Sequence, residues 1–435
     1  MLGRLARMGW RNLSRNKRRT WITVAALAGG LGLSNASWVL SIGYMQDAID
    51  AVVGGTAGHL QVLHPGQLEE PNLFDVVEDT DGVIARLDAD PRVEAVTARA
   101  EFAGLLSTGP RSAGALVRAV DPGREGGVTK VPTQVTDGRF VSGPGEVVLG
   151  DDLAAQLRAA VGEEVVVISQ AADGSLANEL WEVVGLVDTG SEVTDRTTAW
   201  VALDGAMALL ALDGAHTVVA RLHATEDAPA VVRDLAAQDG WTGVFYDQSA
   251  VEQPEPVLEP HKTPVDPEAT WATRSWAAIN PAMAEMVALT DVWLIIMVAI
   301  VLGAAGMGAM NTLLMSVTER TRELGILMAV GLKPVHVVLL TVVESLALAV
   351  LSTIIGTGLG LLLSWWLVET GIDLSEGYGD LVFVGVSMDP IMRGRWTLDA
   401  FVWPVAIIFV IAVLASVIPA IRAARLDPAT AMSRR

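Results

Sequence analysis

The stretch SVTERTRELGILMAVGLKP, Ser316 to Pro334, places a densely charged segment between two of the most apolar regions of the chain. Its charged residues are Glu319, Arg320, Arg322, Glu323 and Lys333. Its apolar residues recur at helical spacing and are Leu324, Leu327 and Met328. Gly331 followed by Pro334 is typical of a helix end. The stretch therefore predicts a short amphipathic helix that lies on a membrane surface.

The beginning of this helix has two interpretations. Ser316 and Glu319 have the spacing of a capping box, which would start a new helix, but the preceding apolar segment could also continue through them. A helix that only turns the chain between two spans would show the same pattern of charge. A function for the charges therefore needs support from the rest of the sequence.

The composition indicates a membrane protein. The chain has 435 residues, of which 51% are hydrophobic and only 18% charged, and its mean hydropathy is +0.43. These values lie outside the usual range of soluble globular proteins. The sequence contains no cysteine, which excludes disulfides, zinc thiolate sites and a lipid-modified amino-terminal cysteine on this chain.

Four segments are long and apolar enough to cross a bilayer, which takes about 20 helical residues at 1.5 Å each. The expected organisation is a basic amphipathic segment at 1–20, spans at 21–45, 286–317, 335–368 and 398–421, an outer domain with stalk helices at 46–285, the surface helix at 318–334, a short outer loop at 369–397 and a tail at 422–435. The first span has a longer apolar core than the roughly 7 to 15 residues of a signal peptide, so we expect it to be retained.

The distribution of basic residues predicts the orientation. The first 20 residues contain arginine and lysine but no acid, and the tail adds further arginines. Positive residues near spans are retained in the cytoplasm. We therefore expect both termini and the surface helix to be cytoplasmic, and most of the acid behind the net charge of −20 to lie outside. Tryptophans near the span ends are expected at the headgroup layer and include Trp21, Trp38, Trp293, Trp365, Trp366, Trp396 and Trp403.

The large outer segment has a mixed α/β pattern. GHLQVLH, AGALVRAV and WEVVGLVD are typical of strands, and DDLAAQLRAA and APAVVRDLAAQ have the apolar spacing of helices. The expected fold class is therefore a polytopic α-helical membrane protein with four transmembrane helices and a large mixed α/β extracytoplasmic domain between helices 1 and 2.

Both ends of this segment are expected to be helical. The first span continues through MQDAIDAVV and is predicted to stop at Gly54 and Gly55. The segment from Glu252 to Glu268 is rich in proline and acid, which predicts a linker or exposed loop. Beyond it, ATWATRSWAAINPAMAEMVALT is expected to be helical on either side of Pro281 and to lead into the second span.

At the charged stretch the sequence resembles a known family. ERTRELGILMAVGLKPVHVVLLTVVESLALAVLSTIIGTGLGLLL is similar to the permease signature shared by MacB-type efflux pumps, the lipoprotein-releasing LolC and LolE subunits, and FtsX. WRNLSRNKRRTWIT, GHLQVLHPG, GEVVLGDDLAAQL and PAIRAARLDPATAM resemble the LolC/LolE branch in particular. The resemblance covers most of the chain and is weakest from about Asn72 to Asp137 and in the proline-rich stretch.

The resemblance implies a type VII ABC transporter permease in the bacterial inner membrane, in which two four-span subunits pair with two ATPase subunits. Residues 46–285 would be a MacB-like periplasmic core domain, and the surface helix would be the coupling helix on the ATPase. The residues implied in coupling are Glu319, Arg320, Arg322, Glu323, Leu324, Leu327 and Gly331. The partners implied are an ABC ATPase, a second copy or a homologous permease, the bilayer, and a periplasmic carrier or adaptor; no nucleic acid is expected.

No other chemistry is predicted for this chain. GREGGVTK, Gly123 to Lys130, lacks the second glycine that Walker A requires before its lysine, so ATP and Mg are expected in a partner ATPase and no cofactor in this chain. His59 and His64 are five residues apart on a predicted strand, and alternation places them on opposite faces, which argues against a metal site. No catalytic pattern is present, and we expect a permease subunit and no enzyme.

Two acids fall inside predicted spans, Asp291 near one end and Glu344 near the other. Because a buried unpaired charge is costly, Glu344 needs a partner: it is either part of a proton or ion relay, or an anchor bonded to the first helix or to the surface helix. Trp271 and Trp276 lie near the expected outer boundary, where their indoles could line a lateral opening for acyl chains or act as ordinary interface anchors.

Three functions follow from these observations. The first is a permease that uses ATP hydrolysis by a separate subunit to extract lipoproteins from the inner membrane. The second is MacB-like export of amphiphilic drugs, peptides or glycolipids. The third is FtsX-like signalling to a periplasmic enzyme, for which the outer domain is larger than usual.

Overall fold

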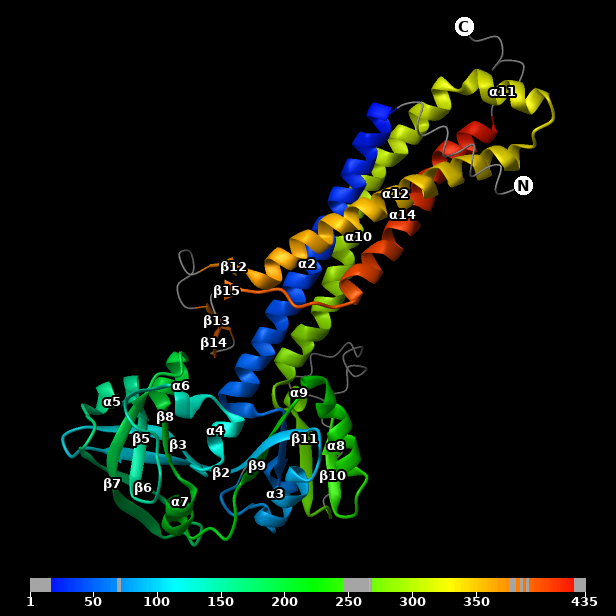
Figure 1. Ribbon diagram of the computed structural model, residues 1–435. Coiled ribbons are helices and arrows are strands. Elements are labelled where there is room, and N and C mark those ends of the chain that lie inside the picture. The colour runs from blue at the N-terminus through cyan, green and yellow to red at the C-terminus, as the bar shows by residue number, and fades with distance from the viewer. Residues whose placement is uncertain are drawn as a thin grey trace. The chain divides into compact units, whose positions relative to one another are not determined.

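The computed structural model of the chain is shown in Figure 1 and describes residues 17–68, 72–245, 266, 268–374, 381–383, 386–388 and 391–425. The chain divides into two compact units, which are described separately. The helical unit consists of Met1–Gln46, Ala288–Glu376 and Ile391–Arg435, and the α/β unit of Asp47–Val287 and Gly377–Pro390.

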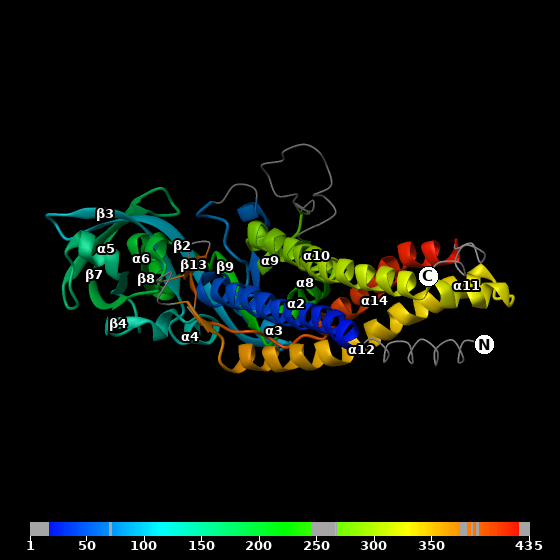
Figure 2. The ribbon, with the colours of Figure 1, turned by 90° about the horizontal axis from the view of Figure 1, so that it is seen from above.

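Long apolar helices make up most of the helical unit. They are α2 (Lys17–Val52), α10 (Pro281–Glu319), α12 (Pro334–Glu369) and α14 (Asp399–Ala424), with the short α11 (Thr321–Ala329) between α10 and α12. Figures 1 and 2 both show the four long helices running side by side within this unit. Among the described residues, these four are long and apolar enough to cross a membrane, so the predicted number of membrane-length helices is confirmed.

Glycines allow α2 and α12 to approach closely. A Cβ atom placed on Gly356 would lie 2.8 Å from the carbonyl oxygen of Ala28, and one on Gly32 would lie 3.2 Å from the carbonyl oxygen of Gly356. A Cβ atom on Gly360 would likewise meet the Asn35 amide at 2.7 Å. Because lipid tails are as apolar as the helices, such close packing is a main source of association in membranes. Gly356 and Gly360 therefore permit a close contact between α12 and α2.

An extended segment crosses α2 on its way to α14, and we call residues 393–395 the strap. The strap follows the short paired strands β12 (Ile372–Asp373) and β15 (Ile391–Met392). The amide of Arg395 donates to the Val39 carbonyl on α2 at 3.1 Å, and the amide of Gly394 donates to the Leu367 carbonyl on α12 at 3.1 Å. Gly43 of α2 lies directly under the strap, where any side chain would overlap its backbone.

The tryptophans of the helical unit do not all behave as expected. Most are exposed, as an aromatic belt requires: Trp21, Trp293, Trp365, Trp366 and Trp403 on the helices, and Trp396 in the segment before α14. Trp38 is only 3% exposed, because its indole packs in the core between α2, α10 and α14. The prediction of a headgroup position for Trp38 was therefore wrong.

Strands of the α/β unit form one large sheet. In the described residues, eleven strands pair in the order β10-β11-β1-β9-β2-β3-β8-β5-β7-β4, and β6 pairs with β2 and β7. The strands are β1 (Leu60–Leu63), β2 (Val93–Ser107), β3 (Ser112–Val120), β4 (Val135–Gly138), β5 (Glu146–Gly150), β6 (Glu164–Gln170), β7 (Leu176–Val187), β8 (Thr198–Ala202), β9 (Thr217–Leu222), β10 (Trp241–Val244) and β11 (Trp271–Ser275). A separate pair is β13 (Leu381–Phe383) with β14 (Val386–Met388).

Helices cover the sheet in two groups, each over its own apolar core. The helices are α3 (Thr80–Asp88), α4 (Glu125–Val128), α5 (Asp151–Leu157), α6 (Glu192–Thr197), α7 (Leu203–Leu210), α8 (Ala228–Ala236) and α9 (Trp276–Ile279), with single turns η1 (Val53–Ala57), η2 (Pro65–Leu68), η3 (Val131–Thr133) and η4 (Thr225–Asp227). α5 and α7 pack on β2, β3, β5, β6, β7 and β8, and α3 and α8 pack on β1, β2, β9 and β10 (Figure 1). The mixed α/β class is confirmed, as are the strands and helices predicted from the five quoted segments.

Two predicted helix boundaries were wrong. α2 itself ends at Val52, but the helical turns do not stop at Gly54 and Gly55: they continue through the π-helical turn η1 as far as Gly58, whose φ of +67° suits glycine and whose amide donates to the Val53 carbonyl. The segment before Pro281 is also not helical from Trp271, because Trp271–Ser275 forms β11 and pairs with both β1 and β10. Most of the proline-rich segment lies outside the described residues.

Candidate functional site

The charged stretch forms a sharp break between two helices. α10 continues through Ser316 to Glu319, and the amide of Arg320 still donates to the Ser316 carbonyl at 3.2 Å. Arg320 then leaves the helical conformation, with φ −106° and ψ 11°, and α11 begins at Thr321. No new helix begins at Ser316, because α10 continues through it. Ser316 and Glu319 therefore do not form a capping box.

α11 ends as its sequence predicts. Gly331 has a φ of +106°, a conformation that costs glycine little, and its amide donates to the Met328 carbonyl at 3.0 Å. Pro334 then opens α12 at its first position, where its missing N–H does no harm. The turn between α11 and α12 is therefore specified by these two residues.

Ion pairs surround the break. The Arg320 guanidinium donates to Glu323 of α11 at 3.2 Å and to Glu344 of α12 at 2.9 Å. Glu319, the preceding residue, accepts from Arg19 of α2 at 3.2 Å. The partner expected for Glu344 is thus supplied by the charged stretch, as the anchor interpretation required, and the structure brings four helices together here.

One face of α11 is buried against the bundle. Leu324 is 5% exposed and packs with Val337 of α12 and Ala423 of α14. Met328 and Leu332 are partly buried against the same cluster. The apolar face predicted from the sequence therefore points inward and holds α11 on the ends of α12 and α14.

The opposite face of α11 is exposed among the residues that the structure describes. Arg322, Ile326 and Val330 follow one another at intervals of four residues, and we call them the α11 stripe. Ile326 is 46% exposed and Val330 84% exposed. Sequence reasoning missed both apolar members, although their spacing from Arg322 could have revealed them. The stripe presents one cation and two aliphatic side chains on a short helix.

The other predicted site residues lie elsewhere. Asp291 is exposed near the start of α10, at the end opposite to α11. Trp271 donates its indole N–H to the Glu78 carbonyl at 2.9 Å and contacts Trp241 in a tilted arrangement, at 5.2 Å between ring centroids. Trp276 begins α9 and packs on the same core of the α/β unit. Their place at a lateral opening for acyl chains stays a prediction.

The GREGGVTK stretch has a structural role in the α/β unit. Glu125 is 1% exposed at its side chain, and its carboxylate accepts from Arg99 of β2 at 2.7 Å. The hydroxyls of Thr97 and Thr129 also donate to this carboxylate. The GREGGVTK stretch therefore contributes Glu125 to a buried ion pair and does not act as a phosphate-binding loop.

His59 is also bound within the α/β unit. Its Nδ1 accepts from the Leu222 amide at 3.0 Å, and its Nε2 lies 3.0 Å from the Thr225 hydroxyl. Burial is the main cause that holds the pKa of this imidazole below its usual value, and the Arg221 charge acts in the same direction. His64 instead accepts from the Gly66 amide through its Nδ1. The two histidines therefore have separate partners.

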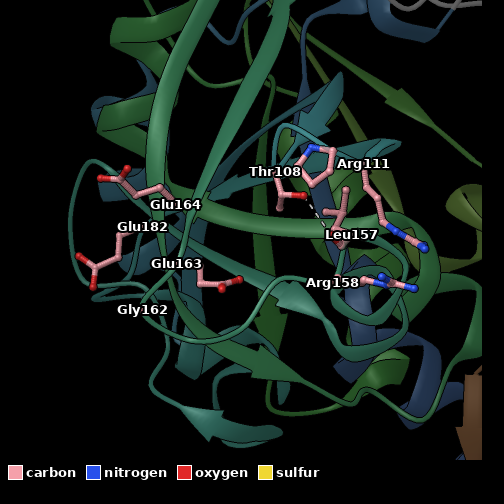
Figure 3. A pocket seen from close by; sticks show the side chains of 9 residues that line it. Thr108, Arg111, Leu157, Arg158, Gly162, Glu163, Glu164 and Glu182 are labelled. Atoms are coloured by element: carbon pink, nitrogen blue, oxygen red, sulfur yellow. Dashed lines mark hydrogen bonds between the residues drawn. The ribbon is translucent and has the colours of Figure 1, made fainter.

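A hollow of about 760 Å³ lies at one end of the sheet (Figure 3). Its charged lining consists of Arg111, Arg158, Glu163, Glu164 and Glu182. In Figure 3 the two arginines extend to one side, and Glu164 and Glu182 to the other. Because these groups diverge, the hollow does not gather them around one ligand, and the break at α10 and α11 is the stronger candidate site.

A bundle of four membrane-length helices, a charged surface helix between two of them and a large α/β domain define a multi-pass membrane protein of the permease type. Two family descriptions match the chain: a MacB-like periplasmic core domain at residues 20–238 and an FtsX-like permease C-terminal region at residues 295–428. The chain belongs to the MacB/FtsX/LolC-type family of ABC transporter permeases.

Curated relatives come from two branches of this family. The lipoprotein-releasing system transmembrane protein LolC of Neisseria meningitidis serogroup B is 25% identical, over 82% of this chain and 81% of the relative. The macrolide export ATP-binding/permease protein MacB of Wolinella succinogenes is 35% identical, but over 31% of this chain and 18% of the relative. The crystal structure of the periplasmic region of MacB from Actinobacillus actinomycetemcomitans covers 42% of this chain and 84% of its own, with 13% identity and a TM-score of 0.32.

Proposed function

We propose that this chain is the permease subunit of an ABC transporter and that the α11 stripe is where its ATPase partner docks. The observation that carries the proposal is the exposed run of Arg322, Ile326 and Val330 on a helix whose other face is fixed to the bundle. The centre of a protein interface is more apolar than the rest of the surface, and arginine is enriched in interfaces. Of the coupling residues predicted from sequence, Arg320 and Leu324 then act inside the chain, and Arg322 acts toward the partner.

The proposed orientation follows from the basic segments. Both termini and α11 would be cytoplasmic, and the α/β unit would be on the outer side of the bacterial inner membrane. Because the natural sequence has no cysteine, single cysteines can report this directly. Cysteines at Ser14, Ser316 and Ser433 should resist an impermeant thiol reagent in intact cells, and one at Ser175 should react. Labelling at Ser433 would contradict the orientation.

For the substrate we propose lipoproteins that are released from the outer leaflet. The support is the length of the similarity, since LolC relatives match 82% and 98% of this chain along most of their own length. A LolC-like permease would work as a pair, with a second copy or a homologous chain, and with a separate ATPase that holds the ATP and Mg. Force produced at α11 would then act on the outer side, where a soluble carrier receives the lipoprotein.

A second candidate is MacB-like export of amphiphilic compounds. It is favoured by the higher identity of 35% to the MacB relative, although that match covers only 31% of this chain. The two candidates share the docking of α11 and differ in what the outer domain releases. They are therefore separated by a substrate assay, while a variant of α11 tests the part that they share.

The docking experiment uses full-length protein in liposomes with an ATPase encoded beside it. Replacing Ile326 and Val330 together by serine should abolish stimulation of ATP hydrolysis, because both lie on the uncovered face. The matched control is Val193→Ser, which changes a valine that is 67% exposed in the α/β unit and should have no effect. Unchanged stimulation in the double variant would contradict docking at the stripe.

The substrate experiment adds a labelled lipoprotein to the same liposomes and a soluble acceptor outside. ATP-dependent transfer to the acceptor is expected. Trp276→Ala tests the lateral opening, and a loss of transfer without a loss of ATP hydrolysis would support it. Trp271→Ala is less suitable, because the Trp271 indole also contacts the Trp241 ring in the domain. No transfer, together with stimulation by a free amphiphilic drug, would favour export.

A further inference from the structure

The position of Arg320 is unusual because it separates two helices by a single residue. α10 ends at Glu319 and α11 begins at Thr321, and the dihedral angles of Arg320 interrupt the helix between them. A helix cannot transmit bending stiffness across a residue that leaves the helical conformation. The helix is therefore broken between α10 and α11, and the Thr321 hydroxyl bridges the break by donating to the Val317 and Thr318 carbonyls at 3.2 and 2.8 Å.

The side chain of Arg320 makes a different link. Its guanidinium lies between Glu323 on α11 and Glu344 on α12, and the Arg320 and Glu344 side chains are only 18% and 10% exposed. Charges that are largely removed from water interact more strongly than those at the surface, and an arginine can hold two carboxylates in a fixed geometry. The pair therefore ties the first turn of α11 to the body of α12.

The ion pair at the end of α10 is weaker than the pair between Arg320 and Glu344. Glu319, at the end of α10, pairs with Arg19 of α2, but the two side chains are 43% and 23% exposed. Exposed pairs of this kind contribute little because water and salt screen them. The apolar contacts of Leu324 also lead to α12 and α14, through Val337 and Ala423. Polar and apolar contacts thus both join α11 to α12, and Val317 of α10 packs on the same apolar cluster.

We propose that Arg320 is a positioning residue whose ion pair with Glu344 fixes α11 on α12, so that a displacement of α11 enters the bundle through α12. This inference rests on the proposed function of α11 as the docking helix. α12 contacts α2 through Gly356, Gly360 and Gly32, where the two backbones lie so close that the helices have little room to shift relative to each other. A movement of α12 is therefore passed to α2 without a flexible side chain between them.

The test measures how firmly α11 is held on α12. The natural chain has no cysteine, so nitroxide labels can be placed at Ala329→Cys on α11 and Val350→Cys on α12, both at exposed positions. Full-length protein in lipid nanodiscs should give one narrow distance by pulsed electron paramagnetic resonance. Arg320→Gln should remove the narrow peak, and Glu344→Gln, which preserves the size of the side chain, should do the same.

Two controls separate positioning from general loosening. Arg322→Gln removes a neighbouring, exposed arginine and should leave the narrow peak. Arg320→Lys should broaden the peak less than Arg320→Gln, because a cation remains near Glu344 but cannot hold both carboxylates in the fixed geometry of a guanidinium. A narrow peak in both Arg320→Gln and Glu344→Gln would overturn the proposal. Equal broadening in Arg322→Gln would also overturn it, because the effect would then not depend on the pair.

The outcome does not depend on the identity of the ATPase. The labels report on this chain alone, so a failure of the positioning role leaves docking at the α11 stripe untested by the same data. Conversely, normal ATPase stimulation in the Ile326 and Val330 variant would contradict docking at the α11 stripe. A narrow peak in the parent protein would still support the link between α11 and α12.

Discussion

The α/β unit and the helical unit each contain a largely buried arginine–glutamate pair, and the surroundings of the two pairs differ. Arg99 and Glu125 are 4% and 1% exposed, and two threonine hydroxyls complete the hydrogen bonding of the carboxylate. Arg320 and Glu344 are 18% and 10% exposed and lie at a break between helices. The first pair joins parts of one folded core, and the second joins a surface helix to a span.

The comparison shows that the same kind of ion pair has a different role according to its burial and its place in the fold. A fully enclosed pair resists separation because either partner alone would remain as an uncompensated buried charge. A pair at a junction with partial access to water is held less strongly, but it controls the orientation of a helix. Four predictions test this contrast, from the largest expected effect to the smallest.

Removal of the enclosed carboxylate should have the largest effect. Glu125→Ala leaves the Arg99 guanidinium buried without its partner, and we expect the α/β unit to lose about 3–5 kcal/mol of stability. Hydrogen exchange of the β2 amides in the full-length protein measures this loss. Glu192→Ala breaks an exposed pair with Arg196 in the same unit and should change exchange little. A similar small effect of both variants would remove the distinction between enclosed and exposed pairs.

Removal of the junction charge should cost less. Glu344→Gln keeps the shape of the side chain and leaves Arg320 bonded to Glu323, so we expect a loss of about 1.5–3 kcal/mol, the range for a hydrogen bond to a charged group. The increase in exchange should be confined to the amides of α11. Equally fast exchange throughout α12 and α14 would show that Glu344 supports the whole bundle.

His59 extends the contrast to a single buried group. Its pKa is held below the unfolded value near 6.5, chiefly by burial, and the nearby carboxylates of Asp50, Glu94 and Glu226 oppose this only in part. The unfolded chain therefore binds the proton more readily, so stability should be constant above pH 7.5 and should fall as the pH decreases through 6.5 toward the folded pKa. Thermal unfolding between pH 7.5 and 5.5, followed by tryptophan fluorescence, measures this dependence.

The control for His59 is His59→Asn, whose amide oxygen can still accept from the Leu222 amide but does not titrate in this range. Its unfolding temperature should vary less with pH than that of the natural protein. The same slope in both proteins would assign the pH dependence to other groups.

The exposed pair at the end of α10 should show the smallest effect. Arg19→Gln removes the contact with Glu319, and we expect a change within about 0.2–1 kcal/mol that becomes smaller as salt is added. Thermal stability at low and high ionic strength provides the measurement. A loss as large as that of Glu344→Gln would show that both sides of the break are held equally.

The sequence predicted the parts of the fold that depend on local pattern. Four apolar stretches specify the spans, and Gly331 with Pro334 specifies the end of α11, because each signal lies within a few residues. β11 could not be recognised around Trp271, since its strand character comes from pairing with β1, more than 200 residues earlier in the sequence. The burial of Trp38 likewise depends on neighbours from α10 and α14.

The candidate site was predictable in part. The charged residues of the stretch were identified because a cluster of charges between two apolar segments can be recognised in the sequence. Glu344 was identified because a charge inside a span needs a partner. Which of these residues point inward was not visible: Arg320 turns to Glu344, while Ile326 and Val330 remain outside. That distinction depends on the angle at which α11 packs on α12 and α14.

The strap at residues 393–395 has a consequence for the order of events during biosynthesis. Its two backbone hydrogen bonds require the Val39 carbonyl of α2 and the Leu367 carbonyl of α12 to be in place already. Because the chain is made from its amino terminus, α2, α10 and α12 leave the ribosome before the strap, and α14 follows it. Both hydrogen bonds of the strap can therefore form only after α2 and α12 have been synthesised, which places closure of the strap late in the synthesis of the chain.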